Sequence, residues 1–189
     1  MALFRIAEPA VEPVSVADAR AWLRIDHEGD DALLGDLIRA ARVTVENETG
    51  KALIDQQWRL TRDRWPSGDV LTMPRGPVSG ILSVVIYDRD GNPDVVDTAD
   101  LVLDGLSDPA RLYFENRPAP GRRMNGIEID FSCGYGPSGA DVPEPLRRAI
   151  LMLVAHGYEF RGAFRADDQP VSWPDGVLPL LRPYRRARL

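Results

Sequence analysis

The 189-residue chain is poor in the side chains that build disulfide frameworks and metal centres, since it has one cysteine and two histidines. A single cysteine cannot form an internal disulfide, so stability must come from packing. A structural zinc site needs several thiolate or imidazole ligands, whereas His27 and His156 lie far apart in the sequence. The sequence therefore excludes a cysteine-rich zinc site and disfavours a histidine-based one.

Long apolar runs and an excess of positive charge are also absent. No run approaches the roughly 18 apolar residues of a membrane-spanning helix, and the N-terminus lacks a secretory pattern, so we expect synthesis in the cytoplasm and no membrane partner. The net charge of -6 and the pI near 5.0 argue against tight wrapping of nucleic acid. Four arginines in the last eight residues, RPYRRARL, are a local exception.

Helical patterns occupy both ends of the chain. Ser15 is placed to cap a first helix, with Asp18 as its capping-box partner. Asp30 is placed to cap a second helix, which Gly50 ends as a left-handed residue. A third helix is expected over residues 141–160, with Asp141 as the cap and Glu144 as its partner. Its apolar stripe is assigned to the core or to subunit packing and comprises Leu146, Ile150, Leu153 and Val154.

Between these helices, residues 53–133 follow a period of two in short runs separated by Gly, Pro, Asn and Asp, which indicates a small, mostly antiparallel sheet. The segment DRDGNP, residues 88–93, is typical of a hairpin turn. The fold class predicted is therefore α+β: two N-terminal helices and one long C-terminal helix, an inserted sheet and an extended C-terminal tail. The parts expected are 1–52 (helical), 53–133 (β-rich), 134–165 (the helix that completes the helical part) and 166–189 (loop and tail).

Reactive side chains do not form a convincing catalytic set. Cys133 ends a strand well before the third helix, and nothing local pairs it with His156, so a cysteine hydrolase is a remote alternative. HEGDD, residues 27–31, is explained by helix capping and the helix dipole rather than by a metal. We predict no enzyme activity, no cofactor and no metal.

Three segments of the sequence, taken in order, resemble a known protein family. They are EPVSVADARAWLRIDHEGDDALLGDLIRAARVTVENETGKALIDQQW, FSCGYGPSGADVPEPLRRAILMLVAHGYEFRG and GVLPLLRPYRRARL, with a strand-rich middle after the first. Together they resemble the head-tail connector (adaptor) proteins of tailed phages and phage-derived gene transfer agents. The resemblance covers nearly the whole chain and is sharpest in the end blocks.

The resemblance implies a structural protein of the particle neck that assembles in the host cytoplasm. It implies a dodecameric ring below the portal protein, next to a stopper or tail-terminator protein, with double-stranded DNA passing through its channel without specific binding. Another neck component, such as a stopper or tail-completion protein, is the nearest alternative, and a small DNA-binding protein is remote. The portal-docking residues it implies are Leu180, Leu181, Pro183, Tyr184, Arg185 and Arg186.

Overall fold

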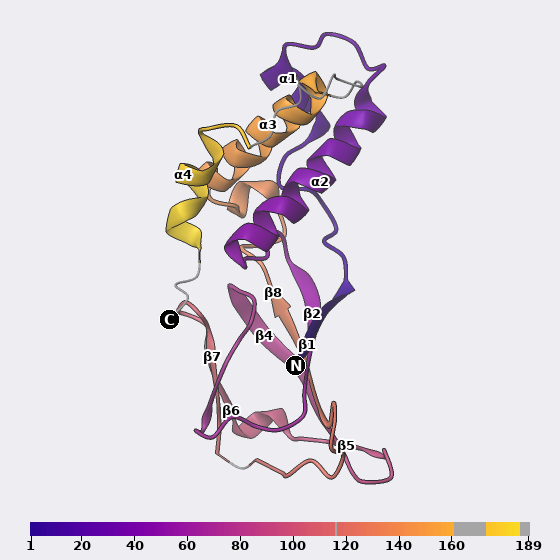
Figure 1. The fold of residues 1–189 in the computed structure, drawn as a ribbon, viewed down its shortest axis with the longest axis vertical. Helices are drawn as coiled ribbons and strands as arrows, with labels where there is room; N and C mark the ends of the chain where they lie inside the picture. Colours follow the sequence, from indigo (N-terminus) through magenta and orange to yellow (C-terminus); the bar gives the residue numbers. More distant parts are fainter. Residues whose placement is uncertain (116, 161–172, 186–189) are drawn as a thin grey trace. The chain divides into compact units, whose positions relative to one another are not determined.

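The structure, a computed structural model, describes residues 1–115, 117–160 and 173–185. Contacts divide the chain into two compact units (Figure 1). Met1–Ala10 and Asp55–Tyr135 form one, here called the sheet unit, and Val11–Ile54 and Gly136–Leu189 form the other, the helical unit. Within the described residues, no helix has the length and apolarity needed to cross a membrane.

The helical unit contains α1 (Val16–Leu23), α2 (Asp31–Thr49), α3 (Glu144–Glu159) and α4 (Val177–Leu181). The predicted capping box of α1 is confirmed: the Ser15 hydroxyl accepts from the Asp18 amide, and the Asp18 carboxylate accepts from the Ser15 amide. The Asp18 carboxylate accepts hydrogen bonds from the Ser15 hydroxyl first and from the Ser15 amide second, and these lower the pKa of Asp18. Gly50 ends α2 with φ 72°, as its left-handed role requires.

The predicted start of the third helix is wrong by three residues. Asp141 does not cap α3; it closes a 3-10 turn, Gly139–Asp141, whose cap is Ser138, and its carboxylate accepts from the Ser138 amide at 2.9 Å. The α-helix begins only at Glu144, after Pro143. A residue that precedes a proline is driven into extended backbone, and Val142 accordingly has ψ 131°.

The extended C-terminal tail of the prediction is also incorrect for the described residues. Residues 177–181 form the fourth helix, and a 3-10 turn, Arg182–Tyr184, follows it. Val177 and Leu181 are buried, and α4 packs against α3. Burial of these apolar side chains holds a helix that is too short to be stable alone.

The sheet unit confirms antiparallel pairing but contains two sheets rather than one. The larger has the order β1-β2-β8-β4-β5, and the smaller has the order β3-β7-β6. The strands are β1 (Ala2–Ala7), β2 (Gln56–Arg62), β3 (Val70–Thr72), β4 (Val78–Tyr87), β5 (Pro93–Val95), β6 (Leu101–Asp104), β7 (Arg111–Phe114) and β8 (Ile127–Cys133), with a 3-10 turn at Thr98–Asp100.

Strand β1 is the main surprise in this unit. Sequence analysis counts residues 1–10 with the helices, whereas Ala2–Ala7 pairs with β2 at the edge of the larger sheet. The predicted hairpin joins β4 to β5. In its turn Gly91 has φ 88°, and the Asp88 carboxylate accepts from the Asp90 and Asn92 amides. Hydrogen bonds from the Asn92 side-chain amide first and from the Asn92 backbone amide second lower the pKa of Asp88.

Candidate interaction surfaces

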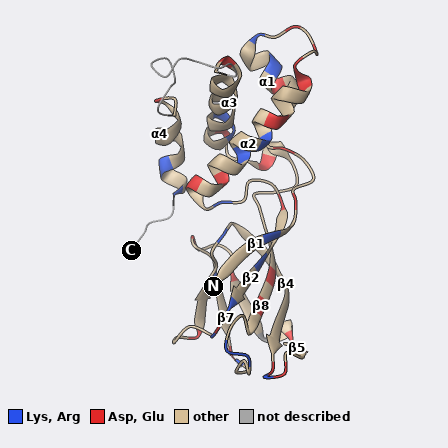
Figure 2. Cartoon of the chain, turned by 45° about the vertical axis from the view of Figure 1, so that its right-hand side comes forward, with Lys and Arg blue, Asp and Glu red and all other residues tan. Residues whose placement is uncertain are grey.

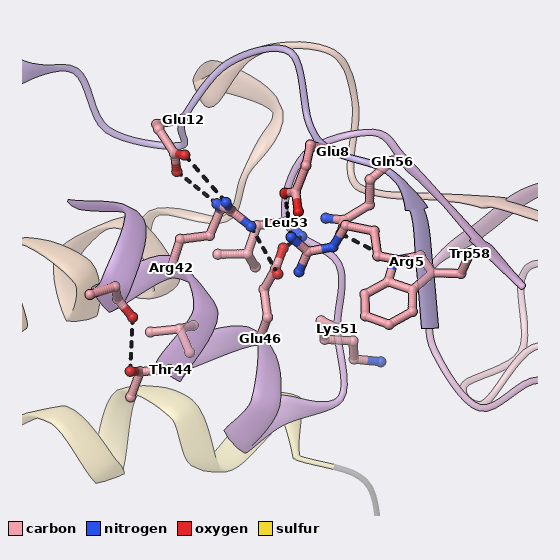
Figure 3. A network of polar contacts seen from close by, with 12 residues as sticks. Arg5, Glu8, Glu12, Arg42, Thr44, Glu46, Lys51, Leu53, Gln56 and Trp58 are labelled. Atoms are coloured by element: carbon pink, nitrogen blue, oxygen red, sulfur yellow. Dashed lines mark hydrogen bonds and ion pairs between the residues drawn. The ribbon is translucent and has the colours of Figure 1, made fainter. Parts of the chain in front are cut away.

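A buried ion network organises the helical unit (Figure 3). The Arg42 side chain on α2 is only 2% exposed; its Nε lies 2.7 Å from Glu12 Oε2, and its Nη1 lies 3.2 Å from Glu46 Oε2. Glu46 also accepts from the Leu53 amide at 3.0 Å. Because Glu12 precedes α1 and Leu53 follows α2, the network fixes the chain segments on both sides of this helix pair.

The predicted stripe on α3 lies largely in the core of the same unit. Leu146, Ile150 and Val154 are buried, whereas Leu153 is half-exposed. Gly157, on the same helix, permits close contact with α2, because a Cβ there would lie 2.8 Å from the Leu37 side chain. These positions explain how α2 and α3 pack closely.

The residues assigned to portal docking differ in their surroundings. Leu181 is buried in its own unit, so in this conformation it cannot anchor a partner. Leu180 and Tyr184 are half-exposed, and Pro183 is exposed. Arg185 is exposed and forms an ion pair with Glu48 of α2. Arg186 lies outside the described residues.

A shallow hollow lies next to that ion pair. Its volume is ≈ 360 Å³, and it is lined by Glu48, Trp173, Pro174, Asp175 and Leu178. Aromatic and aliphatic walls beside two carboxylates suit an arginine or lysine side chain, which can stack on the indole and pair with the carboxylates. The hollow and the exposed part of residues 180–185 together form a surface suited to binding a protein segment.

The larger sheet carries an ion network on its outward face. Arg59 on β2 donates to Asp130 on β8 through Nε at 2.7 Å and Nη2 at 2.8 Å, and its Nη1 lies 3.1 Å from Glu128. The hydrogen bond with Asp130 raises the pKa of Arg59. Tyr87 on β4 donates to Glu128 at 3.1 Å; burial first and this bond second raise the pKa of Tyr87. The network joins three strands of the larger sheet.

The two residues of the remote hydrolase hypothesis belong to different units of the chain. Cys133 is buried at the end of β8 in the sheet unit. His156 belongs to the helical unit, where its ring lies 4.8 Å from that of Phe160, centroid to centroid. Among the residues that the structure describes, no group of three or more His, Cys, Asp or Glu could hold a metal ion.

Sequence reasoning missed the two ion networks and the exposed apolar side chains of the sheet unit. Arg42 and Glu12 are 30 residues apart, and Arg59 and Asp130 are 71 apart, so no local pattern pairs them. The exposed side chains left a weak signal. In LVLD, residues 101–104, apolar side chains occupy positions that face both sides of the strand. A strand with only one buried face needs apolar side chains on that face alone.

Residues 13–88 match the family model described as "Phage gp6-like head-tail connector protein". That segment begins just before α1 and ends in the β4–β5 turn. No curated protein matches the chain.

Solved structures resemble the chain over its whole length. One chain of the structure "Virion of native gene transfer agent (GTA) particle" is 30% identical, with a TM-score of 0.82. Chains of "Neck of empty GTA particle computed with C6 symmetry" and "Neck of native GTA particle computed with C12 symmetry" are also 30% identical, with TM-scores of 0.81 and 0.74. Each match covers 100% of this chain and 97% of the other.

Proposed function

The chain belongs to the phage gp6-like head-tail connector family, and from this membership we propose that it forms a ring in the neck of a phage-like particle, between the portal protein and the tail. It is a structural connector and not an enzyme. The observation that carries the proposal is the full-length match, at 30% identity, to chains of particle necks solved with C6 and C12 symmetry. The C12 symmetry of one of these necks supports twelve copies in the proposed ring.

We propose that the C-terminal segment binds the portal protein. Leu180, Pro183, Tyr184 and Arg185 are at least partly exposed, and the hollow beside Glu48 can receive a side chain from the partner. Aromatic and arginine side chains are frequent anchors of protein interfaces. Leu181 has a different role in this proposal, because its burial holds α4 in place behind the exposed residues.

The ring would surround double-stranded DNA and let it pass. The net charge of -6 disfavours strong binding to phosphates, which suits a passage through which a genome must slide. A stopper or tail-terminator protein on the distal side would complete the neck. In this proposal the protein assembles in the host cytoplasm and remains in the finished particle.

Truncation after Leu181 tests portal docking. The shortened chain keeps Val177 and Leu181, so the helical unit should fold, whereas binding to purified portal protein should fall at least tenfold. Arg39→Glu, a change at an exposed arginine of α2, is the control and should bind as the unchanged chain does. Pull-down and negative-stain images of portal mixed with each variant provide the measurement.

If truncated chains still bind portal with unchanged affinity, the docking assignment is wrong. If the full chain binds only to an already formed portal–adaptor assembly, and not to portal alone, the protein is a stopper or another distal neck component.

A further inference from the structure

The edge strands of the sheet unit differ in how well they are protected against pairing. A strand at the edge of a sheet presents a row of backbone N–H and C=O groups that can pair with another strand. Proteins blunt such edges with short strands, prolines, charged side chains or bulges. The two sheets of the described residues have four edge strands, which are β1 and β5 in the larger sheet and β3 and β6 in the smaller.

All of these edges except β1 are blunted. The strands β3 and β5 have three residues each, and β5 begins with Pro93, which has no N–H to donate. The strand β6 has four residues and ends at Asp104, whose carboxylate forms an ion pair with Arg111 at 2.6 Å. Edges of this kind offer little room for an added strand.

The part of β4 that β5 does not cover is also unsuitable for pairing. The strand β5 pairs only with residues 85–87 of β4. Two register shifts interrupt the rest of β4 between residues 78 and 83, and bulges of this kind turn an edge away from pairing. At the start of β4, Gly105 lies so close to Val78 that an added Cβ would be 2.8 Å from the Val78 carbonyl oxygen.

Strand β1 is open by comparison. Its six residues, Ala2–Ala7, contain no proline, and no strand of the described residues lies on its outer side. Its one charged side chain, that of Arg5, is only 17% exposed and forms an ion pair with Glu8. Phe4 and Ile6 are 45% and 41% exposed. An open edge that also carries exposed apolar side chains is suited to pairing with another strand.

Charge does not select a partner for the sheet unit. The β4–β5 turn has Asp88, Arg89 and Asp90 in succession, and Figure 2 shows basic and acidic segments together at that end of the unit. A surface of mixed charge favours neither an acidic nor a basic partner. Backbone pairing and the side chains of β1 therefore decide which partner fits its edge.

Strand β1 is complementary to a second copy of itself. Antiparallel pairing about a two-fold axis at Phe4 places the two Phe4 rings opposite each other, and Leu3 of each copy opposite Arg5 of the other. Aromatic pairs across strands stabilise a sheet, whereas like charges directly opposite each other destabilise it. This register gives the aromatic pair and keeps the two Arg5 side chains apart. It is centred on the regular part of the strand, because the register with β2 shifts only between Arg5 and Ala7.

We propose that the free protein forms a two-fold dimer in which the outer edges of two β1 strands pair antiparallel, centred on Phe4. The partner is a second copy, because β1 supplies both halves of the contact and the other edges of the described sheets are blunted. Neighbours in a closed ring meet through two different patches, so this two-fold pair does not form within the proposed ring. The dimer is a state of the protein before assembly, in which the apolar edge is covered, and it opens when the ring forms.

Sedimentation equilibrium of the purified full chain tests the dimer. The dimer fraction of the unchanged protein should rise with protein concentration. Phe4→Lys places a charge on the open edge at a position that is not buried, and it should weaken the dimer about tenfold or more. Val102→Lys is the matched control, because Val102 is an exposed apolar residue of the blunted edge strand β6. This variant should dimerise as the unchanged protein does.

Cysteine cross-linking tests the register. The only native cysteine, Cys133, is buried, so a thiol introduced at an exposed position reacts selectively. Phe4→Cys places two thiols opposite each other across the two-fold axis, and a mild oxidant should give a disulfide-linked dimer on a non-reducing gel. Val102→Cys, treated in the same way, should remain monomeric on the gel. Equal cross-linking of the two variants would contradict the β1 contact.

The possible results separate this inference from the proposed function. A protein that stays monomeric at every soluble concentration, or that is already a ring when free, overturns the dimer and leaves the connector role intact. Equal weakening by Phe4→Lys and Val102→Lys would also overturn the β1 contact. Loss of the Phe4→Lys chain from particle necks would show that this edge is a contact of the neck, which overturns its role in the free protein. Absence of the unchanged protein from the neck would instead overturn the connector role itself.

Discussion

The helical unit encloses its charged network, whereas the sheet unit leaves its network half-exposed and places apolar side chains outside. Arg42 has a side-chain exposure of 2%, against 34% for Arg59. A buried ion network loses much if one partner is removed, while an exposed one is weakened by water and salt. The helical unit therefore depends more on its ion network for stability than the sheet unit does.

The largest expected effect comes from a charge in the helical core. Ile150→Asp places an unpaired carboxylate at a fully buried position, at a cost of at least several kcal/mol. Circular dichroism should show loss of the folded helical unit. Leu178→Asp, at an exposed site of α4, is the control and should melt within a few degrees of the unchanged protein. Cooperative unfolding of the Ile150→Asp variant near the melting temperature of the unchanged protein would contradict the buried position of this face of α3.

A paired comparison of the two networks should give the next largest effect. Arg42→Met leaves Glu46 buried without its guanidinium, and we expect a loss of about 3–5 kcal/mol in the free energy of unfolding. Arg59→Met should cost about 1 kcal/mol or less, because water reaches the 34% exposed Arg59 side chain and screens its ion pairs. Chemical denaturation of both variants provides the measurement. Equal losses in the free energy of unfolding would show that the two ion networks contribute equally to stability.

The smallest effect concerns pH at the turn after β6. Hydrogen bonds from Ser107 first, and then from Arg111, lower the pKa of Asp104 from 3.8 to about 2. A lowered pKa in the folded state means that the ionised form stabilises the fold. This contribution is complete above about pH 4 and is lost as the pH falls toward 2.

Nuclear magnetic resonance titration of the Asp104 carboxyl group should find its midpoint near 2. Ser107→Ala should raise that midpoint, whereas Ser79→Ala, on another strand, should not change it. An ordinary midpoint in the unchanged protein would show that the turn after β6 does not form these bonds.

Local patterns in the sequence predict the helices but not the contacts between distant segments. The capping box at Ser15 and the helix C-cap at Gly50 can be predicted, because the residues to which they form hydrogen bonds lie within four positions in the sequence. Asp141 misleads because Ser138 offers a second cap nearby and Pro143 delays the helix. The smaller sheet cannot be recognised from the sequence pattern, because its strands have only three or four residues. A period of two is hard to establish over such lengths.

The candidate surfaces are less predictable still. The resemblance directs attention to the C-terminal residues, but burial of Leu181 depends on how α4 packs against α3. The loops that contain Asp63, Tyr87 and Gly121 are distant in the sequence and are brought together only by hydrogen bonds at the end of the larger sheet. Such groupings depend on the complete fold, and no spacing in the sequence encodes them.

The division of the chain into interleaved segments has a consequence for biosynthesis. Strand β1 is made first but must wait for β2, which emerges after α1 and α2. Those helices then wait for α3 until the whole sheet unit has left the ribosome. Neither unit is a contiguous stretch, so neither can finish folding early during translation, and apolar surfaces of the early segments stay uncovered until the later segments emerge. Recombinant expression of either unit alone would require rejoining its two segments with a new linker.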